Sequence, residues 1–132
     1  MPSLDQQRAL LAHKHVSEVK KWPDEKLRKK YGGMVHRLPA LVRSAGLSQA
    51  LHFVSSRKSD DQKRVLEHLA AQLGHIDARI KSREALLEVV RGAPLPKYLV
   101  LTREVLACVD WYRRLVQGEL GIEAGEQDDD RD

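Results

Sequence analysis

The amino-acid sequence predicts an all-α fold, a single-domain compact bundle of about five to six helices. Aromatic residues make up only 5% of the chain and charged residues 32%, a composition that suits amphipathic helices better than a β-sandwich. Apolar residues recur at steps of three and four along most of the chain, which is the spacing of a helix face. With 132 residues, the chain has room for one hydrophobic core and no second domain.

The helix predicted over residues 27–45 is the element around which the others are expected to pack. Its apolar positions fall on one face, which should form the spine of the core. Lys26, Lys30 and Arg37 follow one flank of that face and give the helix a basic edge. Pro39 is expected to weaken or kink the helix. The apolar positions are Leu27, Tyr31, Met34, Val35, Leu38, Leu41, Val42 and Ala45.

A first helix is predicted over about residues 4–20. Ser3 and Gln6 form a capping box ahead of apolar residues at helical spacing. Pro23 disfavours helical geometry at the residue before it, so the chain should turn there. The first helix and the central helix are therefore expected to run antiparallel.

Two short helices follow the central helix, which should stop at Gly46. The first is predicted over residues 47–54. A capping box of Ser59 and Gln62 should begin the second, whose apolar residues extend over 65–73.

Two further helices complete the predicted bundle. Apolar spacing over residues 76–90 predicts a helix that ends at Gly92. The segment 93–96 contains two prolines and is not expected inside a helix. Thr102 is then the expected N-cap of the last long helix, with Cys108 near the middle of its buried face.

The charge of the chain is unevenly distributed. Residues 123–132 hold six acidic residues and one arginine, a net charge of −5, while the rest holds 22 basic and 13 acidic residues, a net charge of +9. We expect residues 1–121 to form the helical domain and residues 122–132 an acidic, disordered C-terminal tail. A body this basic attracts polyanions, nucleic acid first, although lysines and arginines that only keep helices soluble would produce the same balance.

The densest mixture of basic and aromatic residues surrounds the joint between the first two helices. Such a mixture is able to clamp a phosphate backbone. Solvated helix ends with half-buried aromatic rings would have the same composition. The residues are Lys20, Lys21, Trp22, Lys26, Arg28, Lys29, Lys30 and Tyr31.

No motif in the chain predicts a metal or cofactor site. The single cysteine, Cys108, has no partner for an internal disulfide or a cysteine-based zinc site. His13 and His15 are two residues apart, which on a helix directs them to different faces. Neither an H-E-x-x-H motif nor a glycine-rich phosphate loop is present, so we expect no metal and no cofactor.

Two alternative functions have some support in the residues. Arg8 and His13 match the R-x-x-x-x-H spacing of one class of small helical ribonucleases, although such spacing is common by chance. The short helix after Gly46 could belong to a helix-turn-helix DNA-binding regulator. Its outer face offers few side chains for base readout, however, since Arg57 and Lys58 follow the helix and do not lie on it.

Three stretches of the chain share their order and spacing with a known family. They are residues 31–39, the pattern Gly46-Leu47-x-x-Ala50-Leu51-x-Phe53, and the pattern Tyr98-Leu99-x-Leu101-Thr102-Arg103-Glu104 followed by Trp111. Together they resemble the small all-helical subunit of type III-B CRISPR effector complexes, the Cmr or RAMP module. The resemblance covers about residues 5–120 and leaves out the acidic tail.

The resemblance implies a non-catalytic assembly subunit of an antiviral ribonucleoprotein. In such complexes several copies stack beside a filament of RAMP-type backbone subunits, and together they form the channel in which guide and target RNA pair. Target cleavage belongs to the backbone subunits, and cyclic oligoadenylate synthesis to the large polymerase-like subunit. The implied partners are these subunits, further copies of the chain, and guide and target RNA. No apolar run resembles a signal peptide or a membrane-spanning helix, so we expect no membrane partner and a cytoplasmic location.

Charge placement, and not the resemblance, selects the candidate site residues. Apolar residues at helix ends are candidates for contacts between copies, although packing within the chain would explain them equally well. The RNA-binding candidates are Lys20, Lys21, Lys26, Lys30 and Arg37, followed by Arg57, Lys58, Arg113 and Arg114, and the interface candidates are Trp22, Leu95 and Trp111.

Overall fold

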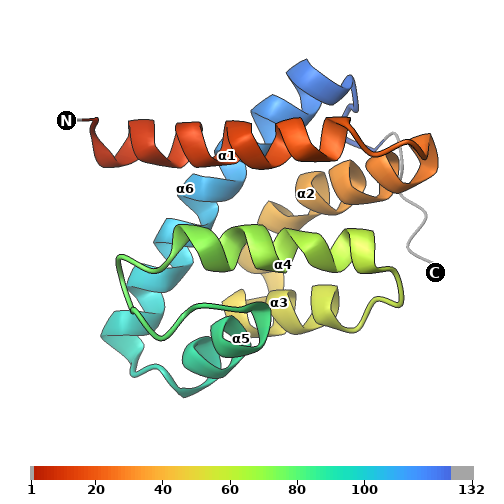
Figure 1. Cartoon of the computed structure of the whole chain (residues 1–132). Helices are drawn as coiled ribbons and strands as arrows, with labels where there is room; N and C mark the ends of the chain where they lie inside the picture. The colour runs from red at the N-terminus through yellow and green to blue at the C-terminus, as the bar shows by residue number, and fades with distance from the viewer. Residues whose placement is uncertain (1, 126–132) are drawn as a thin grey trace.

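The computed structural model describes residues 2–125 and contains six helices and no strands in that range (Figure 1). The all-α fold predicted from the sequence is therefore confirmed. The helices are α1 (Leu4–Lys20), α2 (Glu25–Ala45), α3 (Leu47–Ser55), α4 (Asp60–Gln72), α5 (Arg83–Gly92) and α6 (Leu95–Leu120).

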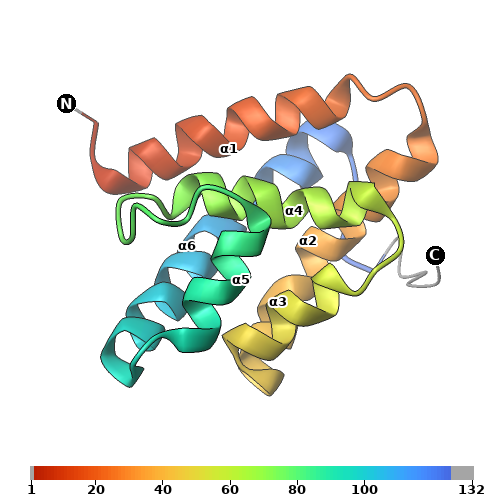
Figure 2. The ribbon, with the colours of Figure 1, turned by 60° about the horizontal axis from the view of Figure 1, so that its bottom comes forward.

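The long helix α6 forms one side of the core and contacts both α1 and α2. Helix α4 lies on the other side, where it packs against α2, α3 and α5. In Figure 1, α1 and α4 both cross in front of α6, and α4 also crosses in front of α2. Figure 2 shows α3 and α5 closing the end of the bundle that is away from α1. Apolar side chains from all six helices therefore meet in one core.

Helix α2 is the spine of this core, as its apolar spacing predicts. Tyr31, Met34 and Leu38 are fully buried along it, and the helix continues through Pro39 to Ala45. Leu27 differs from the prediction, because it lies in the first turn of α2 and is 37% exposed.

The predicted start of the fifth helix is wrong. Residues 73–82 form turns, and α5 begins only at Arg83, after Ser82 accepts a hydrogen bond from the backbone N–H of Ala85. Within the turns, the Asp77 carboxylate accepts hydrogen bonds from Arg79 and from Lys97. The hydrogen bonds from Arg79 hold the pKa of Asp77 well below its usual range. These contacts fix a loop whose apolar residues happen to be spaced as in a helix.

The predicted start of the last helix is also wrong. Helix α6 begins at Leu95, so that Pro96 lies in its first turn, where a helix needs no backbone N–H donor. Thr102 is therefore inside the helix, and its hydroxyl donates to the carbonyl of Tyr98.

The two predicted capping boxes have different outcomes. At α1, the Ser3 hydroxyl accepts from the Gln6 backbone and the Gln6 side chain accepts from the Ser3 backbone, which confirms the first box. At α4, the Ser59 hydroxyl donates to the Asp61 carboxylate instead of capping the backbone, and Gln62 is buried.

Ile122, the first residue of the tail expected from the sequence, is part of the core. Its side chain is 3% exposed and lies against Gly32, where a Cβ atom would come within 2.9 Å of Ile122 Cδ1 and of Val116 Cγ1. The ring Nε2 of His36 donates to the Ile122 carbonyl oxygen over 2.8 Å. The chain is thus fastened to α2 after the end of α6, while residues 126–132 lie outside the described range.

A cluster of aromatic polar side chains occupies the centre of the bundle. The rings of His15 and His68 stack with centroids 4.0 Å apart and planes inclined by 6°. Each Nδ1 atom lies 2.6 Å from a tyrosine hydroxyl, His15 from Tyr112 and His68 from Tyr31. Gln72 donates to the Tyr112 hydroxyl over 3.2 Å. The cluster joins α1, α2, α4 and α6.

Burial keeps both histidine rings of this cluster neutral. Desolvation lowers the pKa of His68 to about 3 and also lowers the pKa of His15. The same burial raises the pKa of both tyrosine hydroxyls. All four groups are therefore uncharged over the physiological pH range.

An ion pair fastens the beginning of α1 to α6. The Arg8 guanidinium donates to both oxygens of Glu104, with Nε 2.6 Å from Oε2 and Nη2 2.7 Å from Oε1. Hydrogen bonding from Arg8 lowers the pKa of Glu104, whose side chain is only 7% exposed. Beside this pair, Trp111 Nε1 donates to Asp5 Oδ1 over 3.0 Å.

Within residues 2–125, no helix is long and apolar enough to cross a membrane. The same residues contain no group of three or more histidine, cysteine, aspartate or glutamate side chains that could hold a metal ion.

The substitution Arg8→Ala is expected to destabilise the protein by about 3 kcal/mol, because it removes the main partner of the buried Glu104 carboxylate and leaves only the weak Cys108 thiol donor and His75 at 3.9 Å. Urea unfolding followed by circular dichroism measures the change. The matched control is Arg114→Ala, which removes an exposed pair with Asp110 and should cost about 0.5 kcal/mol or less. Equal losses in the two variants would contradict the role given to Arg8.

Acidification from about pH 6.5 toward pH 5 is expected to destabilise the protein through the stacked histidines. The unfolded rings bind protons near pH 6.5, whereas folded His68 stays neutral down to about pH 3, so the unfolded state binds more protons. Above pH 6.5, neutral His68 imposes no pH-dependent cost on the folded state. Below pH 6.5, the free energy of unfolding falls by about 1.4 kcal/mol per pH unit because of His68.

Urea midpoints measured across this pH range test the expectation. The double variant His15→Gln with His68→Gln should show a clearly shallower dependence on pH. The same slope in the variant and in the unaltered chain would assign the effect to other groups.

Candidate nucleic-acid interface

The basic edge predicted on α2 lies along one flank of that helix. Lys26, Lys30 and Arg37 fall within about 40° of one another around the helix axis, since each residue advances by about 100°. Lys26 is exposed, and the other two are half-buried. Asp24 caps the helix by accepting from the Lys26 backbone N–H over 2.9 Å, which fixes where the flank begins. We call these three residues the α2 flank.

Phe53 brings a second basic residue next to this flank. The guanidinium carbon of Arg37 lies 5.1 Å from the centre of the Phe53 ring, and that of Arg57 lies 5.3 Å from it. Contact with an aromatic face orients a planar guanidinium group. The fold thus places Arg37 and Arg57 against the same aromatic ring.

The role of Phe53 was not recognised from the sequence. The available signal was its position four residues before Arg57, a spacing at which side chains of one helical turn meet. The contact with Arg37 comes from the packing of α3 against α2, which no local spacing reveals.

The basic residues at the joint between α1 and α2 are not one cluster. The ammonium group of Lys20 lies 3.8 Å from Glu119 Oε1 at the end of α6, and Lys21 is the exposed C-cap of α1. Arg28 donates to the Trp22 carbonyl and so closes the joint. Arg28 therefore has a structural contact, while Lys20 pairs with the end of α6.

The remaining basic candidates lie on other elements. Lys58 is exposed in the loop after α3. Arg113 and Arg114 lie on α6, where each pairs with Asp110, at 3.5 Å and 3.3 Å. Asp110 compensates part of their charge, which lowers their net attraction for a phosphate.

The three interface candidates differ in exposure. Trp22 is half-buried and meets the Tyr31 ring edge-on, and Trp111 is half-buried with its N–H bonded to Asp5. Leu95, in contrast, is 68% exposed in the first turn of α6. Nearby Leu99 is 51% exposed, so the start of α6 carries an apolar surface that the sequence analysis indicated only at Leu95.

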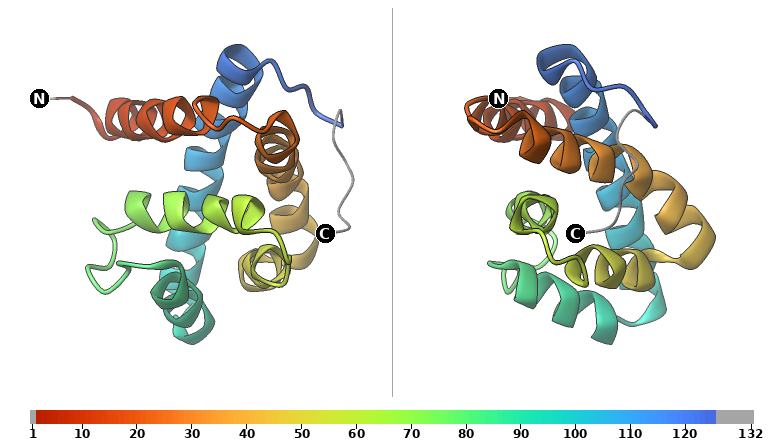
Figure 3. Two further views of the ribbon diagram at one scale, coloured as in Figure 1. Left: turned by 45° about the vertical axis from the view of Figure 1, so that its right-hand side comes forward. Right: turned by 90° about the vertical axis from the view of Figure 1, so that its right-hand side faces the viewer.

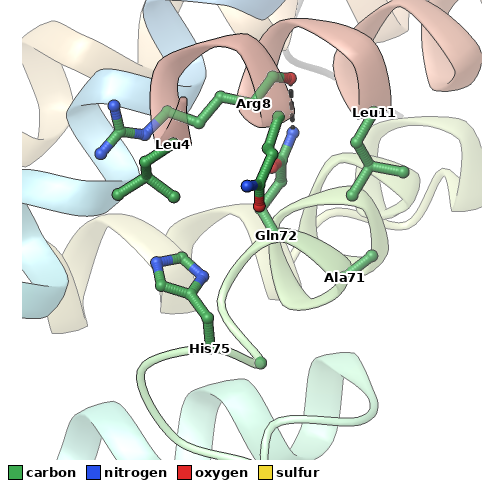
Figure 4. A pocket seen from close by; sticks show the side chains of 8 residues that line it. Leu4, Arg8, Leu11, Ala71, Gln72 and His75 are labelled. Atoms are coloured by element: carbon green, nitrogen blue, oxygen red, sulfur yellow. Dashed lines mark hydrogen bonds between the residues drawn. The ribbon is translucent and has the colours of Figure 1, made fainter. Parts of the chain in front are cut away.

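A pocket of about 230 Å³ lies between α1 and the end of α4 (Figure 4). It contains Arg8, but the guanidinium group extends toward α6, where Glu104 holds it. The Gln72 side-chain amide donates a hydrogen bond to the Arg8 backbone carbonyl oxygen over 3.1 Å. His13 is exposed and does not line this pocket, so the R-x-x-x-x-H residues of the ribonuclease alternative do not share it.

Comparisons with known proteins agree with the fold and with the resemblance noted in the sequence. The family described as "CRISPR-associated protein (Cas_Cmr5)" matches residues 4–119. The CRISPR system Cmr subunit Cmr5 of Thermus thermophilus is 43% identical over 106 residues, which cover 80% of this chain and 89% of that protein. The crystal structure of a CRISPR-associated Cmr5 family protein from Thermus thermophilus has a TM-score of 0.80 and 41% identity, covering 89% of this chain and 97% of the other.

The region that matches the family contains α1 to α5 and nearly all of α6. It also contains the three stretches on which the resemblance was based. Residues 120–132 lie beyond the match, as the sequence comparison indicated for the acidic tail. The chain belongs to the Cmr5 family of CRISPR-associated proteins.

Proposed function

We propose that this chain is a non-catalytic structural subunit of a type III-B CRISPR ribonucleoprotein effector complex. In this role it stacks with further copies along the RAMP-type backbone filament, near the large polymerase-like subunit. It helps to hold paired guide and target RNA through its basic surface. Membership of the Cmr5 family, together with the α2 flank, carries the proposal.

The shape and charge of the candidate surface suit an RNA backbone. The flank is a straight row on one rigid helix, and Arg37 and Arg57 are oriented by the Phe53 ring. Such an arrangement binds phosphates and carries no pattern of donors for individual bases. A double-stranded RNA is recognised mainly by shape and backbone, so this surface supports retention without sequence readout.

A structural role is also supported by how the chain uses its polar side chains. Arg8 and Glu104 neutralise each other, and the stacked histidines are buried and neutral. Burial raises the pKa of the Cys108 thiol, so it is not activated as a nucleophile. These side chains hold helices together.

Charge reversal on the flank, Lys26→Glu with Lys30→Glu and Arg37→Glu, is expected to weaken retention of target RNA by the assembled complex. It should also reduce the dependence of binding on salt, by about 0.7 to 0.9 in the logarithmic slope for each phosphate that the flank no longer binds. Filter binding of labelled target RNA at several salt concentrations measures both effects.

The matched control reverses three exposed charges on other elements, Lys14, Lys81 and Arg103, and so changes the net charge equally. RNA retention should fall less in this control. If both triple variants retain RNA like the unaltered complex, the flank does not contact RNA.

Copies of the chain are proposed to meet through the start of α6. The substitution Leu95→Asp should lower the number of copies in the purified complex, because it places a charge in an apolar contact. Native mass spectrometry counts the copies. Leu10→Asp is the matched control, since Leu10 is 64% exposed on α1 and Leu95 is 68% exposed on α6.

Affinity purification of the tagged chain from its native host tests the assembly as a whole. RAMP-type subunits together with short RNAs that carry CRISPR repeat sequences should co-elute. Recovery of chromosomal DNA fragments in their place would favour the helical DNA-binding regulator.

A further inference from the structure

A row of stacked copies needs two different contact surfaces on each copy, since a surface that pairs only with itself stops at two copies. The start of α6, where Leu95 and Leu99 are exposed, supplies one surface. We propose that the second surface is a groove between the joint of α1 with α2 and the beginning of α4, and that it receives the start of α6 of the next copy. This contact rests on the proposed stacking of copies and identifies its receiving side.

The groove has a volume of about 300 Å³ and three apolar residues in its lining. Trp22 and Pro23 belong to the joint between α1 and α2, and Leu27 lies in the first turn of α2. Leu27 is 37% exposed, although its helical spacing predicted a place in the core. Accessible apolar side chains gathered in a groove are a feature of contact sites between proteins.

One edge of the groove is acidic. Asp60 and Asp61 line it from the first turn of α4, and Asp60 is exposed. Asp61 accepts a hydrogen bond from the Ser59 hydroxyl, and neither aspartate forms an ion pair within residues 2–125. The remaining lining residue, Arg64, lies 3.6 Å from a Glu67 carboxylate oxygen, which compensates its charge. The groove therefore combines an apolar lining with uncompensated negative charge.

The start of α6 has the complementary character. Leu95 and Leu99 are four residues apart and so lie on one side of the helix, where they are 68% and 51% exposed. Arg91 is exposed in the last turn of α5, four residues before Leu95. Its guanidinium Nη1 lies 3.3 Å from His52 Nε2, and it forms no ion pair with a carboxylate in the described part of the chain. An apolar surface beside a positive charge thus faces outward.

The two surfaces lie on opposite sides of the molecule. In Figure 1, α6 begins at the lower left, whereas the joint between α1 and α2 and the beginning of α4 are on the right. Figure 2 shows the same separation. The right-hand view of Figure 3 looks onto the side with the groove and shows the beginning of α4 below the joint. A contact between opposite sides leaves one surface of each kind open at the ends, so copies are able to add in a row.

Apolar and charged groups have separate roles in this contact. Leucine side chains that enter the groove leave water, and the Trp22 ring offers them a large apolar surface. The opposite charges of Asp60 and Arg91 favour this pairing over contacts between like surfaces. A contact of this size is weak for isolated copies, but attachment of neighbouring copies to one filament raises their local concentration.

Native mass spectrometry of the purified complex tests the receiving side. The substitution Leu27→Glu should lower the number of copies as Leu95→Asp does, because it places a charge among the apolar side chains of the groove. Leu4→Glu is the matched control, since Leu4 is 42% exposed in the first turn of α1 and Leu27 is 37% exposed in the first turn of α2. An unchanged number of copies with Leu27→Glu would overturn the proposal.

A mixture of two variants tests whether the contact joins unlike surfaces. A copy with Leu95→Asp keeps its groove, and a copy with Leu27→Glu keeps its start of α6, so the mixture should recover pairs that hold one copy of each variant. Neither variant alone should form pairs. Isotope labelling of one variant identifies the mixed pairs by mass. If mixing recovers no pairs, the two surfaces do not meet and the proposal is wrong.

Cross-linking of the isolated full-length chain keeps the test independent of the complex. The variant Leu27→Cys with Leu99→Cys, treated with a short bismaleimide reagent at high protein concentration, should give a ladder of dimers, trimers and longer products on denaturing gels. Native Cys108 is buried and the pKa of its thiol is raised, so it should not react. The control, Leu4→Cys with Leu99→Cys, should give no ladder.

The outcomes separate this contact from the proposed function. A ladder from a chain that does not co-purify with RAMP-type subunits would support the contact between copies and reject the assembly function. A complex that holds several copies, in which Leu27→Cys with Leu99→Cys gives no ladder, would retain the assembly function and overturn the groove as the receiving surface.

Discussion

The fold depends on a buried stack of two neutral histidines between two tyrosine hydroxyls. His15, Tyr31, His68 and Tyr112 each come from a different helix, so the cluster fixes α1, α2, α4 and α6 relative to one another. Polar groups are costly to bury unless they are bonded, and here the partners are supplied from within the cluster. Apolar packing would tolerate small rotations of these helices, whereas paired donors and acceptors do not.

The orientation of α2 follows from this constraint and determines the basic surface. Tyr31 enters the buried cluster directly after Lys30, so the geometry that satisfies the tyrosine hydroxyl also sets the position of the half-buried lysine. Further along the helix, Leu38 is buried while Arg37 meets Phe53. Core and candidate interface are thus properties of one helix, and a change in its packing would alter both.

Apolar spacing was sufficient to predict the helices that bury one continuous face. It placed α1 and the spine on α2 correctly, because local spacing and tertiary packing agree there. Apolar spacing wrongly predicted a helix around Ile76 and Ile80, which are spaced as on a helix face. These residues lie in a loop, because Asp77 accepts a hydrogen bond from the distant Lys97. The histidine stack and the Arg37–Phe53 contact join residues far apart in the chain, and a single sequence carries no local sign of such pairs.

The notch at Gly32 also decides where the chain can be labelled without disturbing α2. Ile122 fills the notch, so a bulky label at that position would separate the end of α6 from α2. A label placed before Ser3 would extend from the beginning of α1, at the far end of that helix from its joint with α2, and would leave the contact at Gly32 intact.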